Sequence, residues 1–396
     1  MCALGNFREK SVKSMRLLHG VRAHNDKIWS VSSHQKLPLL ATGSSDKTSA
    51  IFRLSEKEKF PKITTLDDTH KRSIRSVMFK PPIDDTVVEE NELLDPPTLA
   101  MGSFDAKLSV WQAELPQDND EDMDQEPREI WEKERKMVER AAQWELMAVI
   151  EGHEHEVKAV AWNCHGSLVA SCSRDKTIWI WETDPDTLEE FECISVLTEH
   201  QQDVKHVIWH PTQNLLASSS YDDTICIYRQ EYDDDDWGCA AVLNGHQGTV
   251  WCSAFEHPQS PSASETTVRL VSASDDLTVR IWSTSKEGSE TKHDALPSSI
   301  KLSNDMHWEQ ECILPSVHTY PVYSVVWSSV SGRIASAGAD GKIAVYTQKD
   351  GVWDIEGVTS AAHGVHEINA LAWSKLDDNR EVLVSGGDDG YVNVWE

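Results

Sequence analysis

Histidine, aspartate and serine recur together in this chain of 396 residues, a combination that could support acid–base chemistry or metal binding. The chain has 17 histidines, and seven of them precede an Asp in a repeating pattern. The seven sets pair His24 with Asp46, His70 with Asp105, His153 with Asp175, His200 with Asp222, His246 with Asp276, His318 with Asp340, and His363 with Asp389. A set that recurs seven times indicates a structural unit rather than one catalytic centre.

The spacing within each set predicts a four-stranded unit. His and Asp are 22 residues apart in four copies, and insertions lengthen the other three. Two stretches of alternating apolar residues lie between them, the period expected of β-strands. An aromatic residue follows each Asp by six positions: Phe52, Trp111, Trp181, Tyr228, Trp282, Tyr346 and Trp395. We therefore expect an all-β fold, a seven-bladed WD-repeat β-propeller.

The repeated residues also predict a hydrogen-bond network in each blade. The Asp carboxylate would hold the His, and a hydroxyl would join the His to the buried indole N–H, which needs an acceptor. Six blades carry the hydroxyl four residues before the Asp, as Thr42, Ser171, Ser218, Ser272, Ser336 and Ser385. The second blade has Met101 at this position, so we expect its network to be broken and that blade to be the least regular.

The ends and insertions of the chain bear on its domain organisation. The last blade lacks an outer strand, which segment 14–19 can supply, so that residues 1–396 form one closed ring. Segment 83–95 interrupts the second blade, and an acidic insertion at 112–145 separates two of its strands. Residues 128–146 favour a helix, which would either pack against the propeller or contact a partner.

No catalytic or metal-binding motif stands outside the repeats. Phosphate loops, His-Glu-x-x-His helices and Gly-x-Ser-x-Gly elbows are absent from the sequence. The eight cysteines form no Cys-x-x-Cys pair, which favours buried thiols over an iron–sulfur or zinc site. A metal at His153 and His155, or calcium at the Asp233–Asp236 loop, is a weaker alternative to a structural histidine and a solvated loop. We therefore expect neither an enzyme nor a bound cofactor.

Charge and hydropathy narrow the class of partner. The net charge of −29 repels phosphate backbones and anionic membranes, so we expect neither a nucleic-acid nor a membrane partner. No apolar run resembles a signal peptide or reaches the length of a membrane span. We expect a soluble intracellular protein.

The top face of such a propeller offers a candidate binding surface. It is formed by the residue before each turn Asp and by two residues shortly after each His. Against the acidic background, cations and aromatics gather at these positions: Lys27, Trp29, Arg75, Phe104, Lys158, Arg174, Lys205, Tyr221, Trp251 and Tyr323. Arg with aromatics is typical of binding hot spots, and an acidic peptide or a chain-end carboxylate would suit this face. The alternative is that these cations only balance nearby Glu156 and Asp203.

Several long runs narrow the resemblance beyond the general repeat. They are residues 150–162, 172–184, 191–197, 202–211 and 215–224, with shorter matches at 73–77, 102–105, 242–246 and 363–369. With these runs the chain resembles the fungal WD-repeat subunit of the cytosolic iron–sulfur protein assembly targeting complex. In the run Cys172-Ser-Arg-Asp-Lys, Arg174 matches the family's top-face Arg. The insertion at 112–145 is longer than is usual in the family.

The resemblance implies a scaffold that binds no cluster and docks other proteins for cluster insertion. Its implied partners are a small adaptor, a large helical-repeat subunit, an iron-only-hydrogenase-like carrier and apo iron–sulfur client proteins. It implies a cytoplasmic location, with the nucleus left open. The alternative is a substrate receptor of a ubiquitin ligase, but blades ending in Trp-Gln, Trp-Glu or Trp-Ser lack the Trp-Asp-x-Arg common in those receptors.

Overall fold

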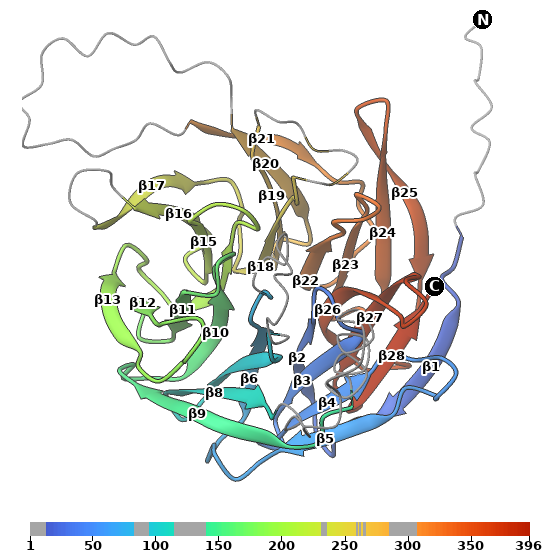
Figure 1. The fold of residues 1–396 in the computed structure, drawn as a ribbon. Helices are drawn as coiled ribbons and strands as arrows, with labels where there is room; N and C mark the ends of the chain where they lie inside the picture. The colour runs from blue at the N-terminus through green and yellow to red at the C-terminus, as the bar shows by residue number, and fades with distance from the viewer. Residues whose placement is uncertain are drawn as a thin grey trace, which may run out of the picture.

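The computed structural model describes residues 13–82, 95–114, 140–230, 236–258, 260, 263, 267–284 and 307–396. These residues form 28 strands in seven four-stranded antiparallel sheets, and no helix occurs among them. The sheets follow one another around a ring, and one edge strand of each sheet lies nearest the centre (Figure 1). The prediction of an all-β, seven-bladed propeller is confirmed.

The blades are numbered here in chain order, and each is written from its inner to its outer strand. Blade one is β2 (Ile28–Ser33), β3 (Leu39–Ser44), β4 (Ser49–Arg53) and β5 (Lys62–Leu66); blade two is β6 (Ile74–Phe79), β7 (Thr98–Ser103), β8 (Lys107–Ala113) and β9 (Trp144–Glu151); blade three is β10 (Val157–Trp162), β11 (Leu168–Ser173), β12 (Ile178–Glu182) and β13 (Glu192–Leu197). Blade four is β14 (Val204–Trp209), β15 (Leu215–Ser220), β16 (Ile225–Gln230) and β17 (Trp237–Leu243); blade five is β18 (Val250–Phe255), β19 (Arg269–Ser274), β20 (Val279–Thr284) and β21 (Trp308–Ile313). Blade six is β22 (Val322–Trp327), β23 (Ile334–Gly338), β24 (Ile343–Lys349) and β25 (Val352–Thr359); blade seven is β26 (Ile368–Lys375), β27 (Glu381–Gly387), β28 (Tyr391–Trp395) and β1 (Leu17–Arg22).

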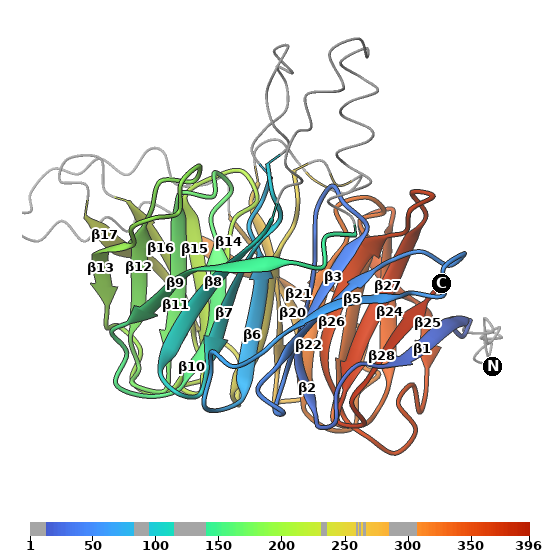
Figure 2. The same cartoon turned by 60° about the horizontal axis from the view of Figure 1, so that its bottom comes forward.

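The core lies between the blades. Every residue of β11 and of β15 is buried, because each blade is covered on both faces by its neighbours. One buried apolar cluster lies at each of the seven interfaces between adjacent blades, including the interface between blades seven and one. The side view shows these sheets standing beside one another (Figure 2). The outer strands are less buried, as the pattern of β13 shows.

A tight turn with one left-handed residue joins the second and third strands of every blade. That residue directly follows the repeated Asp, and its φ lies between +64° and +74° in all seven turns. It is Lys47, Ala106, Lys176, Asp223, Leu277, Gly341 and Gly390. Only two of the seven are glycine, so most turns accept the cost of a side chain in the left-handed region.

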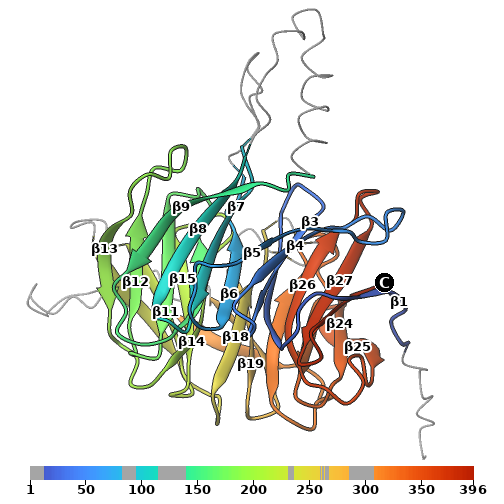
Figure 3. The same cartoon turned by 90° about the horizontal axis from the view of Figure 1, so that it is seen from below.

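The two ends of the described chain close the ring within one sheet. β1 pairs antiparallel with β28, and Val21 lies opposite Val392. The backbone groups of Arg16 and Glu396 bond to each other in both directions. Figure 3 shows β1 beside the C-terminus at the edge of the ring, as its pairing with β28 requires. The predicted closure by N-terminal pairing into the last blade is confirmed, although the paired strand begins at Leu17 rather than Ser14.

The insertion of blade two lies between β8 and β9. β8 ends at Ala113 and β9 begins at Trp144, and residues 115–139 lie outside the described part of the chain. Most of the helix expected at 128–146 therefore cannot be compared. Its end is wrong, because Trp144–Leu146 pair with Trp111–Ala113 as strand. Their pairing with β8 outweighs the local helix propensity of this segment. The stretch 83–94 between β6 and β7 is also outside the described residues.

Removing β1 should weaken the whole ring. Deletion of residues 1–22 removes five paired positions from β28 and uncovers part of the cluster between blades seven and one. At about 1 kcal/mol for each lost backbone bond, we expect the free energy of unfolding to fall by roughly 3–5 kcal/mol. Chemical denaturation measures this loss, and deletion of residues 1–12 alone is the control. Equal stability of the two truncated chains would contradict closure by β1.

Candidate functional site

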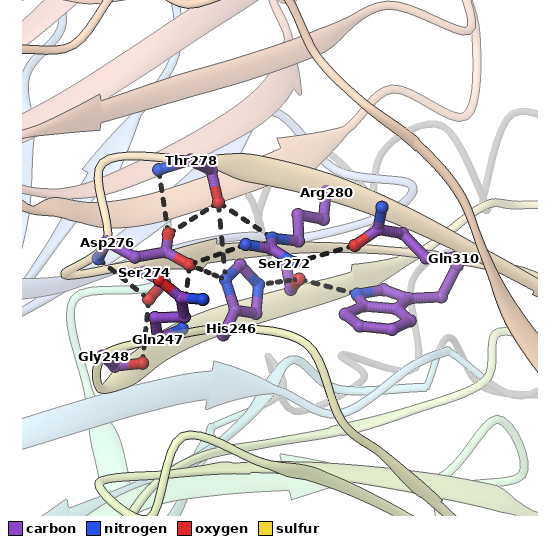
Figure 4. A network of polar contacts seen from close by, with 10 residues as sticks. His246, Gln247, Gly248, Ser272, Ser274, Asp276, Thr278, Arg280 and Gln310 are labelled. Carbon is purple, nitrogen blue, oxygen red and sulfur yellow. Dashed lines mark hydrogen bonds and ion pairs between the residues drawn. The ribbon is translucent and has the colours of Figure 1, made fainter.

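Each repeated histidine lies at one end of its blade, where it contacts the hairpin that carries the repeated Asp. We call this end of the propeller the top face. In blade five, His246 Nδ1 lies 2.8 Å from an Asp276 carboxylate oxygen, and its Nε2 lies 2.7 Å from Ser272 Oγ. The indole of Trp282 donates to the same Ser272 oxygen at 2.8 Å. Figure 4 shows this network, with Arg280 also reaching Asp276. The Asp hairpin and the histidine-bearing connection are thereby held together.

The direction of every hydrogen bond follows from the carboxylate. An ionised Asp can only accept, so His246 Nδ1 carries a proton. Burial lowers the pKa of His246, and in the neutral imidazole Nε2 accepts from the Ser272 hydroxyl. The Ser oxygen is then free to accept from the indole N–H. The chain of donors therefore runs from Trp282 through Ser272 and His246 to Asp276. One ionised group at the end fixes the tautomer and the rotor of the others.

The other predicted network residues lie in equivalent places. Blades three and seven have the complete chain, with Trp181 donating to Ser171 at 3.0 Å and Trp395 to Ser385 at 2.9 Å. His–hydroxyl contacts of 2.7–2.8 Å occur in blades one, three, four, six and seven, through Thr42, Ser171, Ser218, Ser336 and Ser385. The matching His–Asp contacts are His24–Asp46, His153–Asp175, His200–Asp222, His318–Asp340 and His363–Asp389, at 2.8–3.1 Å.

The expectation of a broken network in blade two is wrong. His70 contacts Asp105 at 3.1 Å, and its Nε2 contacts Ser109 Oγ at 2.9 Å. Trp111 donates to the same oxygen at 3.2 Å. Ser109 on β8 lies directly opposite Met101 on β7, so the hydroxyl has moved to the paired position of the neighbouring strand. Two residues that face each other across a ladder can supply the same site.

A second hydroxyl group was missed by the sequence reasoning. In four blades a Thr stands two residues after the Asp and donates to its other carboxylate oxygen. These residues are Thr48, Thr177, Thr224 and Thr278, and the recurring Asp-x-Thr was the available signal. Burial would raise the pKa of Asp175, but hydrogen bonds from His153 and Thr177 lower it below its ordinary value. The carboxylate therefore remains ionised at neutral pH.

The networks use the connectivity of a Ser-His-Asp catalytic triad without its reactivity. A triad serine must present its oxygen to a substrate. Ser171, Ser272 and Ser385 are fully buried, and each oxygen already accepts an indole N–H. These hydroxyls therefore serve as structural bridges. The described residues also contain no group of three or more His, Cys, Asp or Glu side chains arranged to hold a metal ion.

The inner strands enclose a central cavity of about 390 Å³, and the second residue of each inner strand lines it. We call these seven residues the mouth ring: Trp29, Arg75, Lys158, Lys205, Trp251, Tyr323 and Asn369. Six of them were predicted from the sequence. Asn369 was missed because the His-bearing connection of blade seven has one extra residue, which shifts the offset from His363.

Each of the three cations of the mouth ring lies against at least one aromatic ring. The Arg75 guanidinium lies 5.1 Å from the Trp29 ring centre, and Lys158 Nζ lies 4.3 Å from that of Phe104. Lys205 lies between Tyr221 and Trp251, at 5.1 and 5.2 Å. Such contacts hold the cations in place while leaving their charge available. The structure thus gathers cations from blades two, three and four at one opening.

The cations differ in whether a carboxylate already neutralises them. Arg174 contacts Glu156 at 3.5 Å, Lys205 contacts Asp203 at 3.3 Å, and Lys27 contacts Asp388. These three cations therefore form ion pairs with nearby carboxylates. Among the described residues, no carboxylate forms an ion pair with Arg75 or Lys158. Burial lowers the pKa of Lys158 to about 8, with Lys205 and Arg75 adding to the effect against the attraction of Glu156.

The opposite side of the mouth is acidic. Asp275 accepts the indole N–H of Trp251, and Asp388 forms an ion pair with Lys27. The pKa of Tyr323 is raised to about 12, mainly by burial and next by the charge of nearby Glu367. Arg72 was not predicted, yet it contacts both Glu156 at 3.3 Å and the Phe104 carbonyl at 2.8 Å. The mouth therefore has a positive side over blades two to four and a negative side over blades five to seven.

The repeats match a known family. The model of the WD domain, G-beta repeat, matches residues 15–52, 144–182, 191–229, 237–283, 310–347 and 358–396. The unmatched stretch between the first two matches contains the inner three strands of blade two, where Ser109 replaces the usual hydroxyl. The fold and the networks therefore define a WD-repeat propeller.

Curated relatives narrow the family further. The chain is 94% identical over 382 residues to a probable cytosolic iron-sulfur protein assembly protein 1 of Meyerozyma guilliermondii, covering 96% of this chain and all of the relative. It is 57% identical to the protein of that name in Candida albicans and 44% identical to that in Vanderwaltozyma polyspora, each over 96% of this chain and at least 99% of the relative. The chain belongs to the cytosolic iron-sulfur protein assembly protein 1 family.

In the part of the chain that the structure describes, no helix is long and apolar enough to cross a membrane. The seven described cysteines are all free thiols. Residues 233–235 of the acidic run lie outside the described residues, so the calcium alternative there cannot be compared.

The moved hydroxyl of blade two can be tested by a double-mutant cycle. Ser109→Ala leaves both His70 Nε2 and the Trp111 N–H without a partner, so we expect a loss of about 1–3 kcal/mol in unfolding free energy. Met101→Ser alone removes packing in the core. In the Ser109→Ala background, Met101→Ser also restores a hydroxyl at the position used in the other blades. The loss of unfolding free energy caused by Met101→Ser should therefore be at least about 1 kcal/mol smaller in that background than in the unmodified protein. Denaturant unfolding of the four proteins gives the coupling, and additive costs would contradict the exchange.

Proposed function

We propose that this protein is a non-catalytic scaffold of cytosolic iron–sulfur protein assembly, and that its mouth ring docks an acidic segment or a chain-end carboxylate of a partner protein. The observation that carries the proposal is the pair Arg75 and Lys158. Both cations are held half-buried at the cavity opening, and neither has an ion-pair partner among the described residues.

Burial makes this pair a strong candidate for an anionic partner. A buried charge without a counter-ion is costly, and a carboxylate entering the mouth would remove that cost. The aromatic rings of Trp29 and Phe104 add rigid contact area beside the two cations. Asp275, Glu367 and Asp388 on the other side would repel a segment placed in the wrong orientation.

The names of the relatives support the biological setting. They are named for cytosolic iron-sulfur protein assembly, and the alignments span nearly the whole of each chain. We infer that this protein also acts in the cytosol, with the nucleus as a further compartment. Its proposed partners are the small adaptor, the helical-repeat subunit, the iron-only-hydrogenase-like carrier and apo iron–sulfur clients. The cluster would be cargo of those partners, and Arg174 on the rim would contribute an outer contact.

Charge reversal at the mouth should separate docking from folding. We expect Arg75→Glu and Lys158→Glu to reduce recovery of assembly factors and apo iron–sulfur proteins from Meyerozyma guilliermondii cytosol by tenfold or more, as expected for hot-spot residues worth about 2 kcal/mol or more. Arg174→Glu should reduce recovery less, because Glu156 already shares its charge. Quantitative mass spectrometry of affinity captures measures the recovery.

Lys349→Glu is the matched control, since Lys349 is an exposed lysine at the far end of β24. Its recovery should equal that of the unmodified protein, and all variants should keep the same melting temperature. Recovery of ubiquitin ligase subunits, or equal recovery with all baits, would overturn the proposed role.

The lowered pKa of Lys158 predicts a pH dependence of docking. Lys158 is protonated below its pKa of about 8 and loses its charge as the pH rises through that value. Affinity for a captured partner should therefore fall between about pH 7 and pH 9. Lys158→Arg keeps the charge throughout this range and should flatten the profile. Titration calorimetry at several pH values measures both, and identical profiles for the two proteins would exclude Lys158 as the responsive group.

A further inference from the structure

Two cysteines lie on one face of blade four. In the ladder between β16 and β17, Cys226 lies opposite Val242, and Tyr228 lies opposite Cys239. A register shift falls between these two pairs, where a bulge disturbs the ladder. Since side chains alternate along a strand and paired residues share a face, Cys226, Tyr228 and Cys239 project to the same side. The two thiols are therefore diagonal neighbours on adjoining strands.

The environments of the two thiols differ in a way that suits a reaction between them. Cys226 is buried in the cluster between blades three and four, and Cys239 packs against that cluster while half-buried. Interaction with Cys239 raises the pKa of Cys226, and the same interaction lowers the pKa of Cys239. Burial raises the pKa of the other cysteines with a resolved shift, Cys164, Cys172, Cys193, Cys252 and Cys312.

We propose that Cys226 and Cys239 form a peroxide-sensitive dithiol that closes to a disulfide between β16 and β17. The inference does not rest on the proposed docking function. Cys239 is the attacking group, because it is the more accessible thiol and the one whose thiolate its neighbour stabilises. Cys226 is the resolving group, because it lies beside Cys239 on the paired strand.

The reaction balances with hydrogen peroxide as the oxidant. The Cys239 thiolate attacks one peroxide oxygen, forming an S–O bond and breaking the O–O bond, and hydroxide leaves and is protonated to water. The Cys226 sulfur, losing its proton, then attacks the sulfenic sulfur and displaces hydroxide, which is protonated to a second water. Two thiols are oxidised by two electrons, and one peroxide is reduced to two waters.

Native peroxide titration followed by mass spectrometry tests the proposal. We expect the treated protein to lose two titratable thiols and about 2 Da, to yield a peptide that links Cys226 to Cys239, and to recover both thiols with dithiothreitol. Cys239→Ser should abolish the link and slow the first oxidation at least tenfold. Cys226→Ser should stop the reaction at a sulfenic acid that a dimedone probe captures.

Cys193→Ser is the matched control. Cys193 lies opposite Trp181 on the outer strand of blade three, the register that Cys239 has opposite Tyr228 in blade four. The place of Cys226 is taken there by Trp179, so the position of the resolving thiol beside Cys193 holds an indole. Faster oxidation at Cys193 than at Cys239 would overturn the proposal. Over-oxidation of Cys239 without a disulfide to Cys226 would also overturn it. If Cys226→Ser fails to fold, the linked peptide of the unmodified protein and the oxidation rate of Cys239→Ser still test the proposal, because Cys239 is only half-buried.

Discussion

The ionised aspartate at each hairpin determines the arrangement of the top face. A carboxylate offers only acceptors, so it places the histidine proton on Nδ1, and the order of every further donor follows. In blade five this chain runs without a gap from Trp282 to Asp276. The same bonds tie the connection that enters a blade to the hairpin of that blade. In six of the seven blades the mouth-ring residue lies five positions after the repeated histidine, so its position depends on that histidine.

Anchored aromatic residues then turn this framework into a rigid surface. The Trp29 indole donates to Ser45 at 2.6 Å, and its ring lies against Arg75. The Trp251 indole donates to Asp275, and its ring lies edge-on to Tyr323 at 5.3 Å between ring centres. A cation held on such a ring loses little further freedom when a partner binds. The polar groups that face the mouth are therefore positioned before any partner arrives.

The sequence predicted what repeats and missed what depends on one blade. The His, Asp and hydroxyl spacing indicated the propeller because seven copies share one local geometry. The exchange between Met101 and Ser109 could not be predicted from a fixed offset, since the equivalence exists only across the ladder of β7 and β8. Asn369 was missed for a related reason, a single added residue in its connection. Arg174 pairs with Glu156, whereas Arg75 has no ion pair among the described residues, and this difference depends on side-chain directions that spacing alone does not give.

The contrast between global and local charge has a consequence for recognition under the proposed function. At a net charge of −29 the protein repels an acidic partner at long range, whereas Arg75 and Lys158 attract it at the mouth. At physiological ionic strength, screening over about 8 Å suppresses the distant repulsion more than the close contact in a half-buried opening. Moderate salt should then speed encounter while leaving the bound contact largely intact, the opposite of ordinary electrostatic steering. The acidic outer surface offers an acidic partner no attraction, so only a segment that reaches the mouth ring is retained. Under the proposed function, discrimination between partners therefore arises from the depth of the site.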